Sequence, residues 1–414
     1  MKKQELIPHL FRTEFSRIAA VLCKRMGIEH MEIAEDIASE TFLQALESWS
    51  YKGIPENPVA WLYAVAKNKT QNHLKHRRVF ENKIIKEEMH SASGAQDMDI
   101  DLSEWNITDS QLQMLFAICH PSIPEEAQVG LALRILCGFG IDEIATAFLT
   151  SKETINKRLF RAREKLRTEN VRIEFPAEAE ISKRLESVLT TLYLLFSEGY
   201  YSENNDNVLR KDLCWEAMRL TRLLVEFQST NLPAVNALLS LMCFHASRFE
   251  ARQNERGEMI LYEDQDEALW NHELISQGAN YLHQATGGNA ISKYHLEATI
   301  AFWHTVKADT KEKWENILRL YDQLLQFEHS PIAALNRVFA LSKVMGKEAA
   351  IREAEELKLV DNHYYFTLLG ELYRDRDPGK SKSCYLKAFA LAKTQADRQI
   401  IQKKLESMGE ICHI

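Results

Sequence analysis

The chain has 414 residues, 45% of them hydrophobic, with 51 basic and 59 acidic side chains and a formal net charge of −8. This length exceeds one ordinary core and predicts two to four domains. No run of about 18 apolar residues is present, so we expect no membrane span and a cytoplasmic protein. The seven cysteines include no C-x-x-C pair and the histidines show no metal-ligand spacing, so we expect reduced thiols and neither a metal nor a cofactor.

Glycine and proline are scarce, at 15 and 9 residues, and this favours long helices joined by short turns. The sequence has no Asn-Gly hairpin signal and no sustained alternation of apolar and polar residues. We therefore predict an all-α fold. Changes in charge and periodicity divide it into residues 1–80, an acidic linker at 81–110, a helical part at 111–172 and a longer helical part at 176–414.

The first part is predicted to contain two helices within residues 5–48, followed by a loop and a third helix. Within the second helix, residues 34–46 carry acids and apolar side chains on different faces. Asn57-Pro58 is a good helix start, because asparagine can cap and proline suits the first helical position. That helix runs past Trp61 into a basic stretch, residues 67–78, that contains no acid.

Two of these features have both a functional and a structural interpretation. Aromatic side chains beside lysines and asparagines suit contact with unstacked bases and phosphates. Equally, Trp61 can be a core residue of a helix whose far side is merely charged. The acids of residues 34–46 can form a protein-docking surface or a solvated face.

After the acidic linker, residues 139–167 are predicted to form a helix-turn-helix whose second helix is capped by Ser151. Ile155, Leu159, Ala162 and Leu166 fall in one narrow stripe of that helix, so its charged residues point elsewhere. Such a helix can read base edges in a major groove. An ordinary helical hairpin with a basic face is the alternative.

Residues 176–414 are predicted to be a series of amphipathic helices, with caps at Ser330-Pro331 and Asp377-Pro378. Late in this part, residues 366–388 resemble one tetratricopeptide repeat, a pair of antiparallel helices. Asp264, Asp266, Asn336 and Arg337 can form a ligand or partner site, or can serve as caps and ion pairs. His304 and Cys243 are interpreted as packing residues.

Taken in order, three segments resemble successive regions of extracytoplasmic-function sigma factors, a branch of the sigma-70 family. Residues 34–46 resemble the region that binds the clamp of the polymerase β′ subunit. Residues 58–78 resemble the regions that melt and read the promoter −10 element, and the preceding loop at 51–57 resembles the loop that captures a flipped base. Residues 139–167 resemble the region that reads the −35 element. Glu143-Ile144-Ala145 and Arg158-Leu159 match the usual pattern closely.

The resemblance also covers the remainder of the chain. Glu263–Trp270 and Ser330–Arg337 look like parts of the tetratricopeptide-like extension that one sigma subgroup carries. The family resemblance implies a non-enzymatic protein that binds core RNA polymerase through the β′ clamp and β subunits of the polymerase. It also implies binding to double-stranded promoter DNA and to the melted −10 strand. We expect residues 176–414 to modulate this activity through an intramolecular or external partner.

The resemblance implies roles for individual residues. The polymerase contacts would be Glu35, Asp36, Glu40 and Phe42. The −10 contacts would be Tyr51, Asn57, Trp61, Lys67, Asn68, Asn72, Lys75, Arg77 and Arg78. The −35 contacts would be Lys152, Glu153, Thr154, Asn156, Lys157, Arg158 and Arg161. Asp97, Asp99, Asp101 and Glu104 would give the linker the charge to pass through a basic polymerase channel.

Two other protein classes remain as alternatives. A tetratricopeptide-type scaffold would not need segregated basic helices. A conventional helix-turn-helix regulator would not need the 34–46 segment and would bind DNA alone as a dimer. An enzyme is disfavoured, because the sequence shows no nucleophile–base set, phosphate loop or metal spacing.

Overall fold

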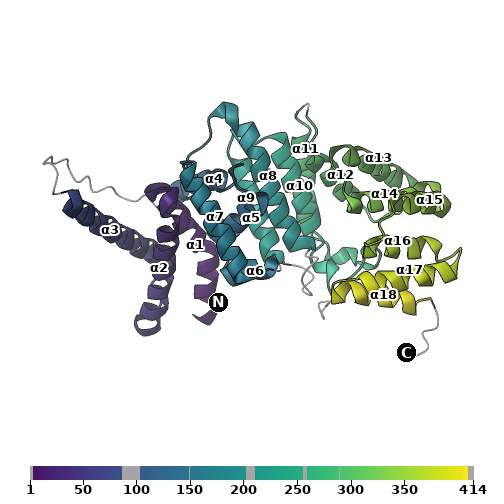
Figure 1. The fold of residues 1–414 in the computed structure, drawn as a ribbon, viewed down its shortest axis with the longest axis horizontal. Helices are drawn as coiled ribbons and strands as arrows, with labels where there is room; N and C mark the ends of the chain where they lie inside the picture. The colour runs from purple at the N-terminus through teal and green to yellow at the C-terminus, as the bar shows by residue number, and fades with distance from the viewer. Residues whose placement is uncertain are drawn as a thin grey trace. The chain divides into compact units, whose positions relative to one another are not determined.

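The computed structural model describes residues 3–85, 103–148, 150–201, 210–254, 259–288 and 290–408 (Figure 1). These residues form helices, turns and one isolated bridge, with no strand, which confirms the predicted all-α fold. The chain divides into two compact units, Met1–Leu194 and Leu195–Ile414. Within the described ranges, every helix is too short or too polar to cross a membrane.

The first unit is built around α1, which packs against α2, α3 and α4. Phe15, Ile18 and Leu22 on α1 are completely buried and form its core. The helices of this unit are α1 (Lys3–Met26), α2 (Met31–Lys52), α3 (Pro58–Ile85), α4 (Glu104–Ile118), α5 (Glu125–Leu131), α6 (Ile141–Ala147) and α7 (Lys152–Thr168). A 3-10 turn, η1 (Ile28–His30), precedes α2, and a short π-helix, η2 (Ala132–Leu136), follows α5.

All four predicted helix caps are confirmed. The Asn57 side chain accepts a hydrogen bond from the Ala60 backbone N–H at 3.0 Å, and Ser151 accepts one from Thr154 at 3.2 Å. Ser330 and Asp377 accept equivalent bonds from Ala333 and Lys380. Each cap satisfies one of the backbone donors that a helix start leaves without an intrahelical partner.

Helix α8 (Glu178–Tyr201) contains the division between the two units. Its first part packs on unit 1: the Thr191 hydroxyl donates to Gln128 Oε1 at 3.0 Å, and Arg184 donates to the Phe116 carbonyl at 2.6 Å. Unit 1 therefore extends beyond the predicted boundary at residue 172. Helix ends also reach into the predicted 81–110 linker, while Asp97, Asp99 and Asp101 lie outside the described residues.

The second unit consists of helices that pack mainly against their chain neighbours. Short 3-10 turns η3 (Glu250–Arg252), η4 (Tyr262–Asp264) and η5 (Glu267–Leu269) connect two of them. Its helices are α9 (Lys211–Glu226), α10 (Pro233–Ala246), α11 (His272–Ala285), α12 (Lys293–Trp303), α13 (Lys311–Phe327), α14 (Pro331–Met345), α15 (Lys347–Leu357), α16 (His363–Tyr373), α17 (Pro378–Leu391) and α18 (Gln395–Glu406).

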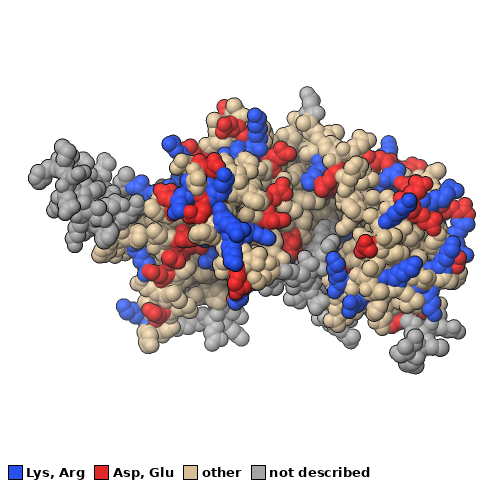
Figure 2. All heavy atoms as spheres, in the orientation of Figure 1, with Lys and Arg blue, Asp and Glu red and all other residues tan. Residues whose placement is uncertain are grey.

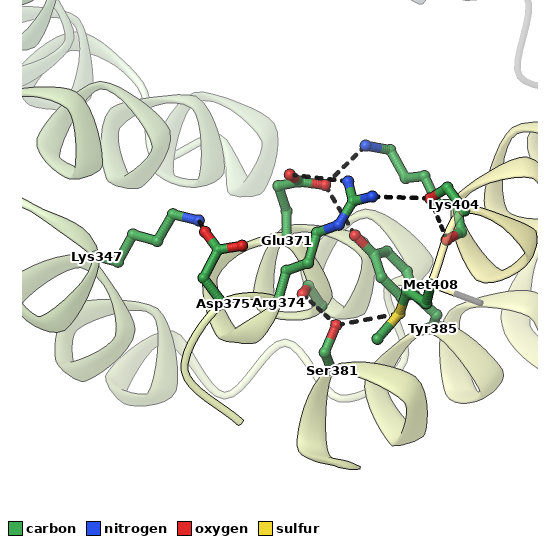
Figure 3. A network of polar contacts seen from close by, with 10 residues as sticks. Lys347, Glu371, Arg374, Asp375, Ser381, Tyr385, Lys404 and Met408 are labelled. Carbon is green, nitrogen blue, oxygen red and sulfur yellow. Dashed lines mark hydrogen bonds and ion pairs between the residues drawn. The ribbon is translucent and has the colours of Figure 1, made fainter. Parts of the chain in front are cut away.

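Helices α16 and α17 form the hairpin predicted at residues 366–388. A Cβ atom on Gly370 would lie 2.8 Å from the Tyr385 ring, so glycine allows the two helices to approach closely. Tyr385 is fully buried, and its hydroxyl donates to Glu371 Oε2 at 2.8 Å. Figure 3 shows Lys404 of α18 reaching the same carboxylate, which joins the last helix to the hairpin.

Candidate nucleic-acid interface

Helix α7 presents the predicted −35 residues on one exposed surface. Ile155, Leu159, Ala162 and Leu166 are buried, as the apolar stripe predicts. The remaining positions therefore face away from the core, and basic side chains gather over α7 in Figure 2. Lys152, Glu153, Thr154, Asn156, Lys157 and Arg161 are exposed, and Arg158 is half-buried.

The basic residues of α7 differ in their partners. Lys152 Nζ lies 2.6 Å from Asp142 Oδ1, and Arg158 lies 3.9 Å from the exposed Glu126 carboxylate. Lys157 and Arg161 make no ion pair with a carboxylate in the described ranges. Exposed ion pairs contribute little, so Lys152 and Arg158 can exchange their carboxylates for phosphates, and Lys157 and Arg161 can bind phosphates without losing a partner.

Two residues add chemical detail to the start and middle of α7. Hydrogen bonds from its own backbone N–H and from the Ser151 hydroxyl lower the pKa of Glu153, which keeps this carboxylate ionised. An ionised carboxylate in a groove accepts from cytosine N4. Phe160 is 57% exposed and was missing from the predicted contacts. The sequence does contain a signal for its exposure, because Phe160 is an apolar residue that lies outside the buried stripe of α7.

The residues predicted to read the −10 element lie on α3, in the loop before it and, for Tyr51, in the last turn of α2. Tyr51 is 93% exposed at the end of α2, where Gly53 adopts a φ of 85° and ends the helix. Asn68, Asn72 and Lys75 are exposed, and Asn57 is exposed while it caps α3. The side chains of Arg77 and Arg78 lie outside the described residues.

Trp61 and Lys67 are partly buried on the same helix. The Trp61 ring meets the buried Trp49 ring edge-on, with centroids 5.4 Å apart. One part of the Trp61 ring thus packs in the core and the rest remains accessible, and its contact with bases stays a prediction. Lys69, two residues after Lys67 on α3, forms an ion pair with Glu40 of α2, with a nitrogen–oxygen distance of 2.8 Å.

The predicted polymerase contacts on α2 divide into two pairs. Asp36 and Glu40 are exposed, but Phe42 is buried against the Phe11 ring, with centroids 5.0 Å apart. Glu35 is also buried, at 5% exposure, and accepts hydrogen bonds from Arg134 and Arg163. Glu35 and Phe42 are therefore not part of the exposed surface of α2, and their contact with polymerase stays a prediction.

Two exposed leucines on α2 were missed. Leu43 and Leu46 are 58% and 47% exposed, among acids that include Asp36, Glu40 and Glu47. The sequence could have indicated their exposure, because both leucines lie in the acidic segment but outside the helical stripe of buried residues. Apolar side chains surrounded by charges are typical of a protein-docking surface.

Family models match both halves of this unit. Residues 10–79 match the Sigma-70 region 2 model, and residues 91–172 match the ECF sigma factor model. The chain belongs to the extracytoplasmic-function sigma factors. It is 28% identical over 134 residues to the RNA polymerase sigma-H factor of Pseudomonas aeruginosa and 29% identical over 133 residues to the ECF RNA polymerase sigma-E factor of Haemophilus influenzae.

Those alignments cover 32% and 31% of this sigma factor and 69% and 70% of the relatives, so a large part of the chain lies outside them. Uncharacterized protein R00370 of Rhizobium meliloti is 31% identical over 389 residues, or 92% of this chain and 91% of that protein. Residues 184–286 match a family of unknown function. The sigma factor thus carries a C-terminal extension. No solved structure matches the chain.

Within the extension, the structure favours the packing interpretation of the candidate site residues. Asp266 caps η5 by accepting from the Ala268 N–H at 2.9 Å. Arg337 pairs with Asp322 of α13 and Glu353 of α15, so it joins three successive helices. Burial raises the pKa of the Cys243 thiol to about 12, as expected for a packing residue.

Proposed function

We propose that this sigma factor binds core RNA polymerase through the exposed face of α2 and directs it to promoters through α3 and α7. The carrying observation is the surface of α7, where Lys157 and Arg161 lack carboxylate partners in the described ranges and lie among exposed polar residues. A helix with this surface suits a major groove, because it offers hydrogen-bonding side chains and positive charge together.

The direct test is transcription in vitro with purified bacterial core polymerase. We expect the full chain to bind core and to produce transcripts with defined start sites. Removal of positive charge in K157A/R161A should abolish most of this product, whereas R167A should not, because Arg167 pairs locally with Glu164 at the far end of the same helix. A full chain that neither binds core nor directs initiation would contradict the proposal.

For the polymerase contact, the exposed leucines offer a sharper test than the buried Glu35. We expect L43S/L46S to weaken core binding by roughly 1–3 kcal/mol, because such side chains bury apolar surface in a docked complex. L386S is a matched control, since Leu386 is an exposed helical leucine, 52% accessible, in the C-terminal unit. Equal binding by all three proteins would exclude this surface.

The C-terminal extension is proposed to modulate the sigma activity. Its test needs a truncation that leaves unit 1 intact, and the Arg184 and Thr191 contacts exclude a truncation after Arg172. A chain that ends at Tyr201 keeps the whole of α8. Identical promoter-specific transcription by this chain and the full chain, with and without inducing conditions, would contradict a modulating role.

A further inference from the structure

Two basic side chains are buried in the core of the C-terminal unit. Arg248, just after α10, is 8% exposed, and Lys313, in the first turn of α13, is 1% exposed. Within the part of the chain that the structure describes, neither lies at ion-pair distance from a carboxylate. A charge that is removed from water without a counter-charge is costly to keep. The packing of the unit alone therefore does not account for these two cations.

Arg248 has hydrogen-bonding capacity that the fold does not use. One terminal nitrogen donates to the Tyr200 hydroxyl at 3.5 Å, which is a long hydrogen bond, and the Nε atom has no acceptor among the described residues. The guanidinium also lies over the Tyr262 ring, with 5.5 Å between Cζ and the ring centroid. A ring face compensates a buried cation only in part. The planar fork of Arg248 thus retains donors for an acceptor that no described residue provides.

Lys313 contacts the same tyrosine. Its Nζ donates to the Val306 carbonyl at 2.5 Å and to the Tyr262 hydroxyl at 3.2 Å, and it lies 5.3 Å from the centroid of that ring. Burial and the positive charge of Arg248 lower the pKa of Lys313, against the opposing effect of Asp309. An anion between the two cations would stabilise both of them.

Aromatic rings adjoin these cations. Tyr262 stacks on Trp270 with centroids 6.2 Å apart and meets His304 edge-on at 5.3 Å, and Trp314 lies 6.0 Å from His304. Trp270 is buried, and its indole N–H has no acceptor within the described ranges. Cations, an unused N–H donor and apolar ring faces therefore occur together, as in sites that bind an anionic group on an apolar body.

We propose that Arg248 and Lys313 form a binding site for a small organic anion, whose carboxylate or phosphate group supplies the counter-charge that the fold lacks. A guanidinium fork holds such an oxyanion through paired hydrogen bonds. Tyr262 and His304 are partly exposed, so the ligand can reach Arg248 beside the tyrosine ring. This binding belongs to the C-terminal unit and does not depend on the proposed contacts with polymerase and promoter DNA.

Thermal unfolding of the full chain with benzoate, phenyl phosphate and the neutral amide benzamide, at equal ionic strength, tests this site. We expect at least one of the two anions to raise the melting temperature of the C-terminal unit by about 3–6 °C at a concentration roughly tenfold above its dissociation constant. Benzamide should leave the melting temperature unchanged. The two anions differ only in the charged group, so the larger response identifies the class of ligand.

The matched variants are R248M and R352M. Both remove one guanidinium from the C-terminal unit, but Arg352 is exposed on α15. We expect R248M to bind the stabilising anion at least about tenfold more weakly than the unaltered chain, because the charge-assisted hydrogen bonds are lost. R352M should bind as the unaltered chain does. R248K keeps the charge but not the fork, so it should bind with intermediate affinity and controls for a folding defect in R248M.

Hydrogen–deuterium exchange locates the bound anion. Exchange should slow in peptides that cover residues 260–271 and 304–314, and not in α7, whose exposed cations also attract anions. The proposal would be overturned if neither anion stabilises the unaltered chain, if R248M and R248K respond as strongly as the unaltered chain, or if protection is confined to α7. Absence of promoter-specific transcription would overturn the proposed function alone, because anion binding is measured without polymerase or DNA.

Discussion

Helices α2 and α7 both carry dense charge, but they use it differently. On α7 the predicted contacts point to solvent, and the apolar stripe accounts for all of its buried positions. On α2 one acid, Glu35, is buried between two arginines, while its neighbour Asp36 is exposed. A charged residue on a helix can therefore contact a partner molecule only if it is not already buried in an ion pair with a distant part of the chain.

The difference follows from how each helix is packed. Helix α7 is covered on one face, so periodicity alone separates its buried and exposed residues. Helix α2 meets α1 and α3, and its acidic edge receives Arg163 from α7. Buried and exposed groups of the same kind should therefore respond differently to substitution.

The largest effect is expected for E35A. It leaves Arg134 and Arg163 without their buried carboxylate, and we expect a loss of about 3 kcal/mol in the free energy of unfolding of unit 1. D36A, one residue along α2, should change it by less than about 0.5 kcal/mol because Asp36 is exposed. Urea denaturation followed by circular dichroism measures both. Equal losses of unfolding free energy in E35A and D36A would contradict the difference in burial between the two acids.

A similar contrast concerns two glycines in the C-terminal unit. G370A would push a methyl group into the buried Tyr385 ring, and we expect a loss of about 2 kcal/mol from overpacking. In G379A the new Cβ would lie 3.4 Å from the Asp377 carboxylate, an ordinary contact, so the change should be small. Thermal unfolding of the two variants measures this, and a stable G370A would mean that α16 and α17 separate without penalty.

Acid should destabilise the extension through His304. Burial, with Arg248 and Lys313 nearby, lowers the pKa of His304 to about 3. Because the unfolded imidazole has a pKa of about 6.5 and binds protons more readily, stability is retained above pH 6.5 and lost as the pH falls towards 3. We expect about 1–2 kcal/mol of this loss by pH 5.

The measurement is the urea midpoint of the extension between pH 7 and pH 5, a range where most carboxylates stay ionised. H304Q removes the titrating group, so its midpoint should fall less than that of the unaltered chain. H329Q, which alters an exposed histidine, should follow the unaltered chain. Parallel curves for all three would exclude His304 as a source of the pH dependence.

The smallest effect is expected for K157A. Folding stability should stay within about 0.5 kcal/mol, since this exposed side chain has no carboxylate partner in the described ranges. Promoter affinity of the polymerase complex should fall by about 1 kcal/mol if Lys157 contacts a phosphate, and the slope of log affinity against log salt should fall by about 0.9. An unchanged slope would place Lys157 away from the DNA backbone.

Features set by nearby residues could be predicted from the sequence. The caps at Asn57 and Ser151 and the hairpin around Gly370 each depend on residues within a few turns. The same holds for the buried stripe of α7. Local spacing therefore predicted the all-α fold and the exposed surface of α7.

Other features depend on residues far away in the chain. Glu35 is separated from Arg134 by 99 positions and from Arg163 by 128, so its burial could not be inferred from the pattern of α2. The attachment of the first part of α8 to unit 1 likewise rests on Gln128 and Phe116. No local pattern distinguishes a helix that ends one unit from a helix that starts the next.

The ion pair between Lys69 and Glu40 connects the two proposed activities of unit 1. One ammonium group cannot neutralise this carboxylate and a DNA phosphate at the same time. If polymerase engages Glu40, Lys69 is released for the promoter, and thermodynamic reciprocity requires promoter DNA to strengthen polymerase binding by the same factor. Glu40 is 59% exposed, so the pair is worth at most about 1 kcal/mol and the cooperativity at most about fivefold. Holoenzyme assembly and promoter binding would then be thermodynamically coupled through this one ion pair.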